Sequence, residues 1–355
     1  MSILIPTAES SVLHHLGSLL HQVDCHRQCD MRRLCTSSRS LKTGFALDID
    51  GVFLHGSTVL PGAKEAVQLL ENSGTPYVFV TNGGGMTEVA KAQSLSDLLQ
   101  ADISEDMVLM SHTPFRKQIE IFADKRVLVI GSDACIDIAE HYGFKKAVSA
   151  RELLQESPTA FKQISVPQLG QEREHQELVE AAFIIGDPFE WGLEIQILTD
   201  QMMPSDVGEK QRIPLFASNA DILYNNEHDA PRYTQGAFVA AFRHLFEKIT
   251  QQPMNVNFSG KPFAITYTMA KSMIEERARV LGSEPPQRFV GIGDSPMSDV
   301  LGANDFGWSS VLLQTGLWSP SRGQEVWERE GAENMKPTMI KRDILEAVEA
   351  LIHDA

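Results

Sequence analysis

The sequence predicts an α/β fold, in which a parallel-sheet core contains a second α/β domain inserted into it. Short apolar runs of strand length alternate with segments of helix length, which is the pattern of a parallel sheet buried under helices. The middle of the chain, residues 123–256, carries apolar strand-length runs of its own. We therefore expect a core built from residues 44–122 and 257–355, and an inserted domain at 123–256.

The first expected core strand is the apolar run Phe45–Leu47, which ends in Asp48 and Asp50. Ligands of open α/β sheets bind just beyond the carboxyl ends of the strands. Because residues i and i+2 of a strand point to the same side, both carboxylates can face one site. Two close carboxylates repel unless one is protonated or a cation lies between them, and Mg2+ prefers oxygen ligands. This stretch therefore predicts a magnesium site, with an ordinary acidic turn as the alternative.

A helix is expected over residues 60–70, with a proline near its start and a glycine after its end. The next buried strand, 77–80, leads into Thr81, Asn82 and three glycines. A hydroxyl group and free backbone N–H groups at a strand-to-helix turn predict a phosphate-binding loop. A plain Asn-Gly turn is the alternative.

The inserted domain is expected after a third short core strand at 108–111. Its apolar strand-length runs are Arg126–Gly131, Ala181–Gly186 and Pro214–Asn219. The polar stretch 155–179, rich in Gln and Glu, is expected to form loop and helix.

After the insertion, Ser259-Gly260-Lys261-Pro262 begins a helix expected to continue towards Leu281. Proline suits the first turn of a helix. A lysine at a helix N-terminus is unfavourable because that end is already positive, and a nearby anion relieves the conflict. We therefore expect Lys261 to meet an anion, with an exposed capping lysine as the alternative.

The last motif follows the expected strand 288–293, which ends at Asp294, with Asp299 five residues further on. Two glycines in this strand are compatible with a dinucleotide motif, but Pro296 stands where that motif needs glycine. Along the chain, the four motifs thus supply an acid, a hydroxyl group, a lysine and a second acid, in this order. Together they predict one polar site.

The composition argues against several classes of protein. Hydrophobic residues make up 43% and charged residues 22% of the 355 residues, as in a globular protein. No apolar run approaches the roughly eighteen residues that span a membrane. The net charge of −16 argues against binding to duplex DNA or anionic membranes. The cysteines (25, 29, 35 and 135) form no CxxC pair, which suits a reducing compartment better than a disulfide framework or zinc site.

Residues 1–43 differ from the rest, with five basic and three acidic residues. An apolar helical face is formed by Val12, Leu13, Leu16, Leu19, Leu20 and Val23. The segment 31–42 contains Ser and Arg but no acid. This leader resembles a mitochondrial transit peptide, which predicts a mitochondrial location. A disordered tail, a start at Met31 and a cytoplasmic location are the alternatives.

The order Asp48-Ile49-Asp50-Gly51, Thr81-Asn82, Lys261-Pro262 and Gly293-Asp294 resembles the haloacid dehalogenase (HAD) superfamily of phosphotransferases. The insertion resembles the α/β cap of subfamily IIA. More narrowly, 217–221 and 293–300 are similar to the cat eye syndrome critical region protein family. The resemblance covers about 44–320 and implies a HAD-type Rossmannoid core with an inserted C2-type cap.

The resemblance also implies a reaction, the Mg2+-dependent hydrolysis of a small phosphorylated metabolite. Asp48 is implied as the nucleophile that forms an aspartyl-phosphate, and Asp50 as general acid and base. Thr81 and the backbone of Asn82 are implied to hold the phosphoryl oxygens, and Lys261 to offset their charge. Magnesium is implied on the Asp48 carboxylate, the Asp50 carbonyl and the Asp294 carboxylate, with Asp299 behind them or bound through water.

The cap is implied to select the substrate. The turn Asp187-Pro188-Phe189-Glu190-Trp191 is expected to face the catalytic pocket, with its aromatic rings as an apolar wall and Glu190 on a hydroxyl or amine. A surface turn whose aromatics pack into the cap is the alternative. Asn219 and Asp221 are further candidates. His55 is a candidate for the edge of the entrance, with a flap residue that has no chemical role as the alternative. Gly236 lies in Thr234-Gln235-Gly236-Ala237, where many members of the subfamily have a Pro-Gly turn, which affects the expected shape of the entrance. A homodimer through the cap is also compatible with the subfamily.

Other activities fit less well. A dehalogenase needs no acid for its leaving group, so Asp50 argues against it, and we identify no cap lysine for a phosphonatase. A phosphomutase usually has a smaller cap. The alternative from another class is a catalytically silent or accessory HAD-fold protein in mitochondrial or glycerophospholipid metabolism. The motifs do not select the substrate among metabolites, nucleotides and phospholipid intermediates.

Overall fold

The computed structural model describes residues 42–156, 177–204, 209–224, 228, 230–320 and 326–353. Nearly all of the predicted leader, 1–43, and most of the polar stretch 155–179 lie outside these residues. None of the helices in the described ranges is long and apolar enough to cross a membrane.

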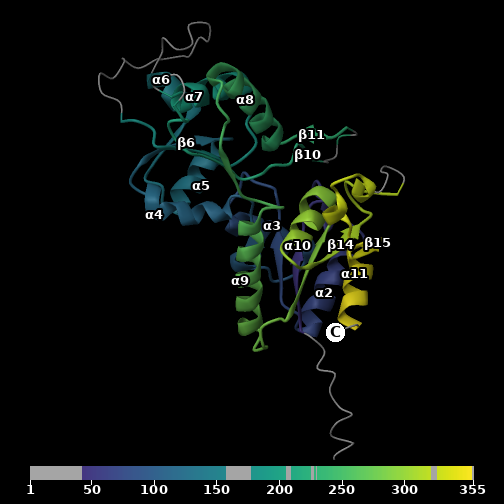
Figure 1. Cartoon of the computed structure of the whole chain (residues 1–355). Coiled ribbons are helices and arrows are strands. Elements are labelled where there is room, and N and C mark those ends of the chain that lie inside the picture. Colours follow the sequence, from purple (N-terminus) through teal and green to yellow (C-terminus); the bar gives the residue numbers. More distant parts are fainter. Residues whose placement is uncertain are drawn as a thin grey trace, which may run out of the picture. The chain divides into compact units, whose positions relative to one another are not determined.

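Within the described residues, six strands form a fully parallel first sheet (Figure 1). In sheet order they are β15 (Met339–Lys341), β14 (Ser309–Leu313), β13 (Arg288–Gly293), β1 (Thr43–Leu47), β4 (Tyr77–Val80) and β5 (Val108–Leu109). The predicted parallel-sheet α/β class is thus confirmed. Strands β1 and β13 are neighbours although most of the chain separates them, and Leu47 pairs with Ile292. This register places the carboxyl ends of β1 and β13, which lead into the first and last motifs, side by side.

Helices cover both faces of the first sheet, and the side chains of a strand alternate between these two faces. Phe45 and Leu47 point into one apolar cluster, whereas Ala46 points into another. The helices of the first cluster are α2 (Ala63–Ser73), α3 (Glu88–Leu99) and α11 (Ile344–His353), and those of the second are α9 (Ala264–Val280) and α10 (Leu301–Asp305). Strands β1 and β4 are therefore buried on both sides, which explains their largely apolar composition.

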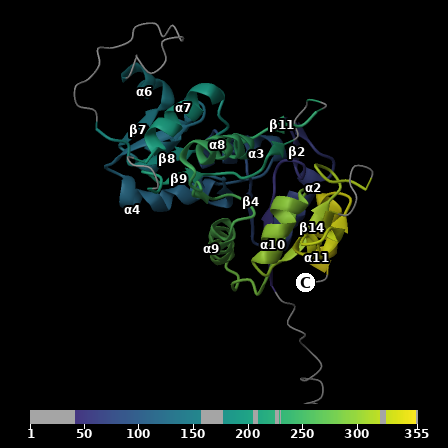
Figure 2. The same ribbon diagram turned by 45° about the horizontal axis from the view of Figure 1, so that its top comes forward.

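A second parallel sheet of five strands lies within the described residues between β5 and α9 (Figure 2). Its order is β12 (Val256–Phe258), β9 (Leu215–Ala217), β8 (Ala181–Ile184), β6 (Arg126–Ile130) and β7 (Lys146–Ser149). We call this sheet with its helices the cap. Helices α6 (Ala150–Glu156), α7 (Trp191–Met202) and α8 (Gln235–Thr250) cover one face, and α4 (Ile119–Phe122) and α5 (Ala134–Tyr142) the other.

Two hairpins and several short helical turns complete the described elements. The hairpins are β2 (Leu54–His55) with β3 (Thr58–Val59), and β10 (Leu223–Tyr224) with β11 (Arg232–Tyr233). The turns are η1 (Glu105–Met107), η2 (Thr113–Gln118), η3 (Pro296–Val300), η4 (Val326–Glu328) and η5 (Glu333–Met335).

Element boundaries differ modestly from the predictions. The helix expected from residue 60 begins at Ala63, because Gly62 before it has a left-handed backbone conformation (φ 79°). The strand expected at 108–111 ends at Leu109. The sequence analysis missed β7, β12, β14, β15 and both hairpins, which are short or only partly apolar.

Candidate active site

The carboxyl ends of strands from both sheets line one cavity of about 320 Å³. Asp48, Asp50, Thr81, Asn82 and Asp294 follow strands of the first sheet, and the cap contributes Asp187, Asn219 and Asp221. Lys261 lies between the cap strand β12 and helix α9. All four predicted motifs therefore meet at a single position. This is where open α/β sheets bind ligands.

Lys261 joins the first motif to the last. Its Nζ donates to Asp48 Oδ1 at 2.5 Å and to Asp299 Oδ1 at 2.7 Å. Burial alone would lower the pKa of Lys261, but the charges of Asp299 and Asp48 raise it overall. The anion expected beside this lysine is thus supplied by two carboxylates of the protein itself.

The carboxylate of Asp294 is held by the backbone at Leu317. Its Oδ2 accepts a hydrogen bond from Leu317 N at 2.6 Å. A side chain on Gly316 would begin 1.8 Å from the same oxygen, so only glycine fits there. Burial, and then the charge of Asp299, raise the pKa of Asp294 to about 7.

Asp48, Asp294 and Asp299 are buried, and one oxygen from each lies within 4.8 Å of the others. Burial raises the pKa of Asp48 well above its ordinary value; Lys261 acts in the opposite direction, and the neighbouring acids add to the rise. Three buried carboxylates against one lysine leave excess negative charge. A hard divalent cation with oxygen ligands matches this donor set.

Asp50 differs from the other acids because it is exposed to the cavity. Its Oδ2 accepts a long hydrogen bond of 3.4 Å from Thr81 Oγ1, which in turn accepts from Gly83 N at 2.9 Å. Thr81 is buried at the end of β4. The side chain of Asp50 is therefore free to meet a substrate atom or a water molecule.

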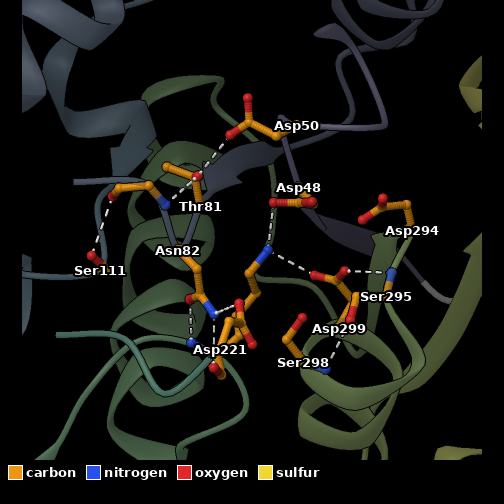
Figure 3. Close-up of polar contacts among 12 residues, drawn as sticks. Asp48, Asp50, Thr81, Asn82, Ser111, Asp221, Asp294, Ser295, Ser298 and Asp299 are labelled. Atoms are coloured by element: carbon orange, nitrogen blue, oxygen red, sulfur yellow. Dashed lines mark hydrogen bonds and ion pairs between the residues drawn. The ribbon is translucent and has the colours of Figure 1, made fainter. Parts of the chain in front are cut away.

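Asn82 connects the first sheet to the cap (Figure 3). Its Nδ2 donates to Asp221 Oδ2 at 2.8 Å and to the backbone oxygen of Lys261 at 2.9 Å. Its Oδ1 accepts from Lys261 N at 2.7 Å, and its backbone oxygen accepts from Asn219 Nδ2 at 3.2 Å. Asn82 thus fixes the backbone of the catalytic lysine candidate and the cap edge together.

Comparison with known proteins agrees with this geometry. A family profile described as haloacid dehalogenase-like hydrolase matches residues 45–145, and a HAD-hydrolase-like profile matches 258–347. The chain belongs to the haloacid dehalogenase-like hydrolases. The first matched segment extends into the cap beyond α5, and the second begins at the last residue of β12.

Individual members of the HAD family give the same result. The chain is 29% identical over 344 residues to a mitochondrial hydrolase of Saccharomyces cerevisiae, covering 87% of this chain and 95% of that protein. The structure of a p-nitrophenyl phosphatase from Archaeoglobus fulgidus aligns with a TM-score of 0.61 at 20% identity, covering 88% and 99% of the two chains. A glycerol phosphate phosphatase from Mycobacterium tuberculosis, in complex with magnesium, aligns at 0.58 and 18% identity, covering 86% and 76%. The predicted HAD fold and hydrolase class are confirmed.

The cap turn of this HAD protein is only partly directed to the cavity. Asp187 lines it and accepts a hydrogen bond from Gln235 N at 2.8 Å. Phe189 and Glu190 instead line a second cavity within the cap, and Phe189 is 85% exposed. Trp191 packs its ring 5.6 Å from that of Phe238 and donates to Pro188 O. The packing of Trp191 into the cap matches the alternative given for this turn.

The structure also places His55 and Gly236, which the sequence analysis named at the entrance. His55 is exposed in β2 and lines the cavity, as expected for an entrance residue. A side chain on Gly236 would begin 2.2 Å from the backbone oxygen of Asp221, so the cap edge requires glycine there.

The sequence analysis missed a buried polar network beside the predicted phosphate-binding loop. Glu88 accepts hydrogen bonds from Thr113 and Tyr142, each at 2.6 Å, and pairs with Arg116 at 3.0 Å. His112 bonds Tyr142 Oη at 2.7 Å, and burial lowers the pKa of His112 to about 4. Its members lie on α3, η2 and α5, so no local pattern in the sequence marked it.

Proposed function

We propose that the protein is a Mg2+-dependent phosphatase that hydrolyses a small phosphorylated metabolite through an aspartyl-phosphate. The observation that carries the proposal is the meeting of Asp48, Thr81, Lys261 and Asp294 in one cavity. Phosphoryl transfer depends mainly on positioning and on neutralisation of charge, and this set supplies both. The names of the two phosphatase structures above support the same class of reaction.

Asp48 is the proposed nucleophile. A bond forms between its carboxylate oxygen and phosphorus, while the bond from phosphorus to the leaving oxygen breaks. Lys261, 2.5 Å from Asp48, orients this carboxylate and offsets the charge of the phosphoryl oxygens. Thr81 and the backbone of Asn82 hold those oxygens.

Asp50 is the proposed general acid and base. It gives its proton to the leaving oxygen in the first step, and accepts a proton from the attacking water in the second. The second step releases inorganic phosphate and restores Asp48. The exposure of Asp50 to the cavity supports this role, since both partners must reach it.

Magnesium fits the buried carboxylates, and would be held by Asp48, Asp294 and the backbone carbonyl of Asp50, with Asp299 behind them. When bound, it neutralises phosphoryl charge and aligns the phosphoryl group. Asp299 already bonds Lys261 and Ser295 N, so it positions the lysine as well.

The test is a single-turnover reaction with Mg2+ and a panel of phosphorylated metabolites, followed by mass spectrometry of the Asp48 peptide. A phosphoryl adduct on Asp48, absent in Asp48→Asn and without Mg2+, is the expected result. Neither adduct nor turnover with any compound, in protein that still binds Mg2+, would favour the accessory-protein alternative.

We also propose a mitochondrial location, supported by the acid-poor leader and by the name of the yeast relative. A fusion of residues 1–43 to a fluorescent protein should enter mitochondria, whereas a cytoplasmic distribution would contradict the proposal. The homodimer through the cap stays a prediction, which light scattering of the purified protein tests.

A further inference from the structure

Lys91 is a cation in the catalytic cavity that the proposed mechanism does not use. It lies in the first turn of α3, directly after the phosphate-binding loop, and its half-buried side chain lines the cavity with Asp48 and Thr81. Lys261 is the other lysine in this lining, and two carboxylates engage it. The two lysines therefore differ in the charges that surround them.

No carboxylate of the described residues pairs with Lys91. The acid on the same turn of α3, Glu88, is turned away towards Thr113, Tyr142 and Arg116. A lysine near a helix N-terminus is unfavourable unless an anion approaches it. At Lys261 that anion comes from the protein, whereas at Lys91 the described chain supplies none, which leaves the position open to a ligand.

The carboxylates of the cap limit where a second anion can lie in the cavity. The cap presents the carboxylates of Asp187 and Asp221 to the cavity. An anionic group on that side would meet two like charges, whereas hydroxyl or amine groups would find acceptors. A second anion of a substrate is therefore favoured beside the cation of Lys91 and disfavoured beside the cap carboxylates.

We propose that Lys91 binds a second anionic group of the substrate, so that the substrate is a phosphate monoester that also carries a carboxylate or another phosphoryl group. This inference rests on the proposed phosphatase function. The reacting phosphoryl group already has Thr81, the Asn82 backbone, Lys261 and the metal site. Lys91 is thus a residue for substrate selection and not for chemistry.

The test compares two matched pairs of substrates. 3-Phosphoglycerate and glycerol 3-phosphate differ only in a carboxylate against a hydroxymethyl group. Propanediol bisphosphate and propanediol monophosphate test the phosphoryl source in the same way. The wild-type protein should prefer the doubly anionic member of at least one pair, and Lys91→Gln should reduce that preference roughly tenfold, mainly through KM.

Controls separate this role from a structural one. Lys91→Arg should retain most of the preference, because it keeps the charge. Lys64 is equally half-buried but lies on α2 outside the cavity, so Lys64→Gln should change nothing. Turnover of glycerol 3-phosphate and of p-nitrophenyl phosphate by Lys91→Gln should stay within about twofold of wild type.

Several outcomes would overturn the proposal. A wild-type protein with no preference in either pair would do so, as would an equal loss for both members of a pair, which would assign Lys91 to the reacting phosphoryl group. If no substrate turns over, the phosphatase function fails separately. Calorimetric binding of 3-phosphoglycerate to Asp48→Asn still tests the subsite, since adding Lys91→Gln must weaken that binding roughly tenfold and leave binding of glycerol 3-phosphate unchanged.

Discussion

Glu194 is an acid that the cap buries with one carboxylate oxygen unpaired among the described residues. It lies in the first turn of α7 and is 6% exposed. Its Oε2 is buried and has no hydrogen-bond partner among the described residues. Burial, opposed by a backbone hydrogen bond and reinforced by the charge of Glu190, raises the pKa of Glu194 from 4.5 to about 7. Ionisation of this group should therefore destabilise the fold.

The pH dependence follows from the direction of this shift. Below about 4.5 the group is protonated in both the folded and the unfolded state, so it contributes no difference. Between about 4.5 and about 7 the folded state keeps the proton that the unfolded state has lost, and stability falls as pH rises. At 1.36 kcal/mol for each pKa unit, the full penalty above this range is roughly 3 kcal/mol.

The variant Glu194→Gln removes the ionisation and keeps the shape. Urea unfolding followed by tryptophan fluorescence should show a gain of about 1–3 kcal/mol in the free energy of unfolding at pH 8, and little gain at pH 4.5. Glu65 is an exposed acid in the first turn of α2, so Glu65→Gln should alter stability similarly at both values. An equal effect of Glu194→Gln at pH 4.5 and pH 8, or a loss confined to pH 8, would refute the reasoning.

Three further predictions concern the catalytic cavity. Asp50→Asn should lower kcat for p-nitrophenyl phosphate by roughly 10²–10⁴ while Mg2+ binding measured by calorimetry persists, because only the proton transfer is lost; a near wild-type rate would exclude the assigned role. Lys261→Met should cost about 3–5 kcal/mol in urea unfolding without added metal, since two buried carboxylates lose their cation; an unchanged midpoint would show that the ion pairs contribute no net stability. Gly316→Ala should abolish Mg2+ binding and turnover, because its methyl group would displace Asp294; full activity would mean that Asp294 is not a ligand.

Much of the first sheet could be predicted because local patterns carry the information. Strands such as Tyr77–Val80 are buried on both faces and are therefore continuously apolar. The strand ends are also local features, so Asp48, Thr81 and Asp294 could be identified as candidates before any contact was known. The general rule that ligands bind at the carboxyl ends of parallel strands then placed them together.

The parts that were missed lack such local signals. Strand β7 is only partly buried, and the hairpin β10–β11 is exposed, so neither has a continuous apolar run. The network of Glu88, His112 and Tyr142 joins three elements, and each residue alone resembles an ordinary polar position. Lys91 is similar, because its lack of a partner among the described residues is visible only in three dimensions.

The sequence by itself determined the α/β class, the inserted cap and the identity of the motif residues, because strand burial and strand ends leave their mark within a few residues. Only the tertiary structure decided which side chains touch. Lys261 reaches Asp48 across 213 positions of the chain, and Asn82 reaches Asp221 across 139. The cap turn shows the same limit, since Trp191 packs against Phe238 and Phe189 lies outside the catalytic cavity. Such contacts depend on how separate elements pack, and no short stretch of sequence specifies that.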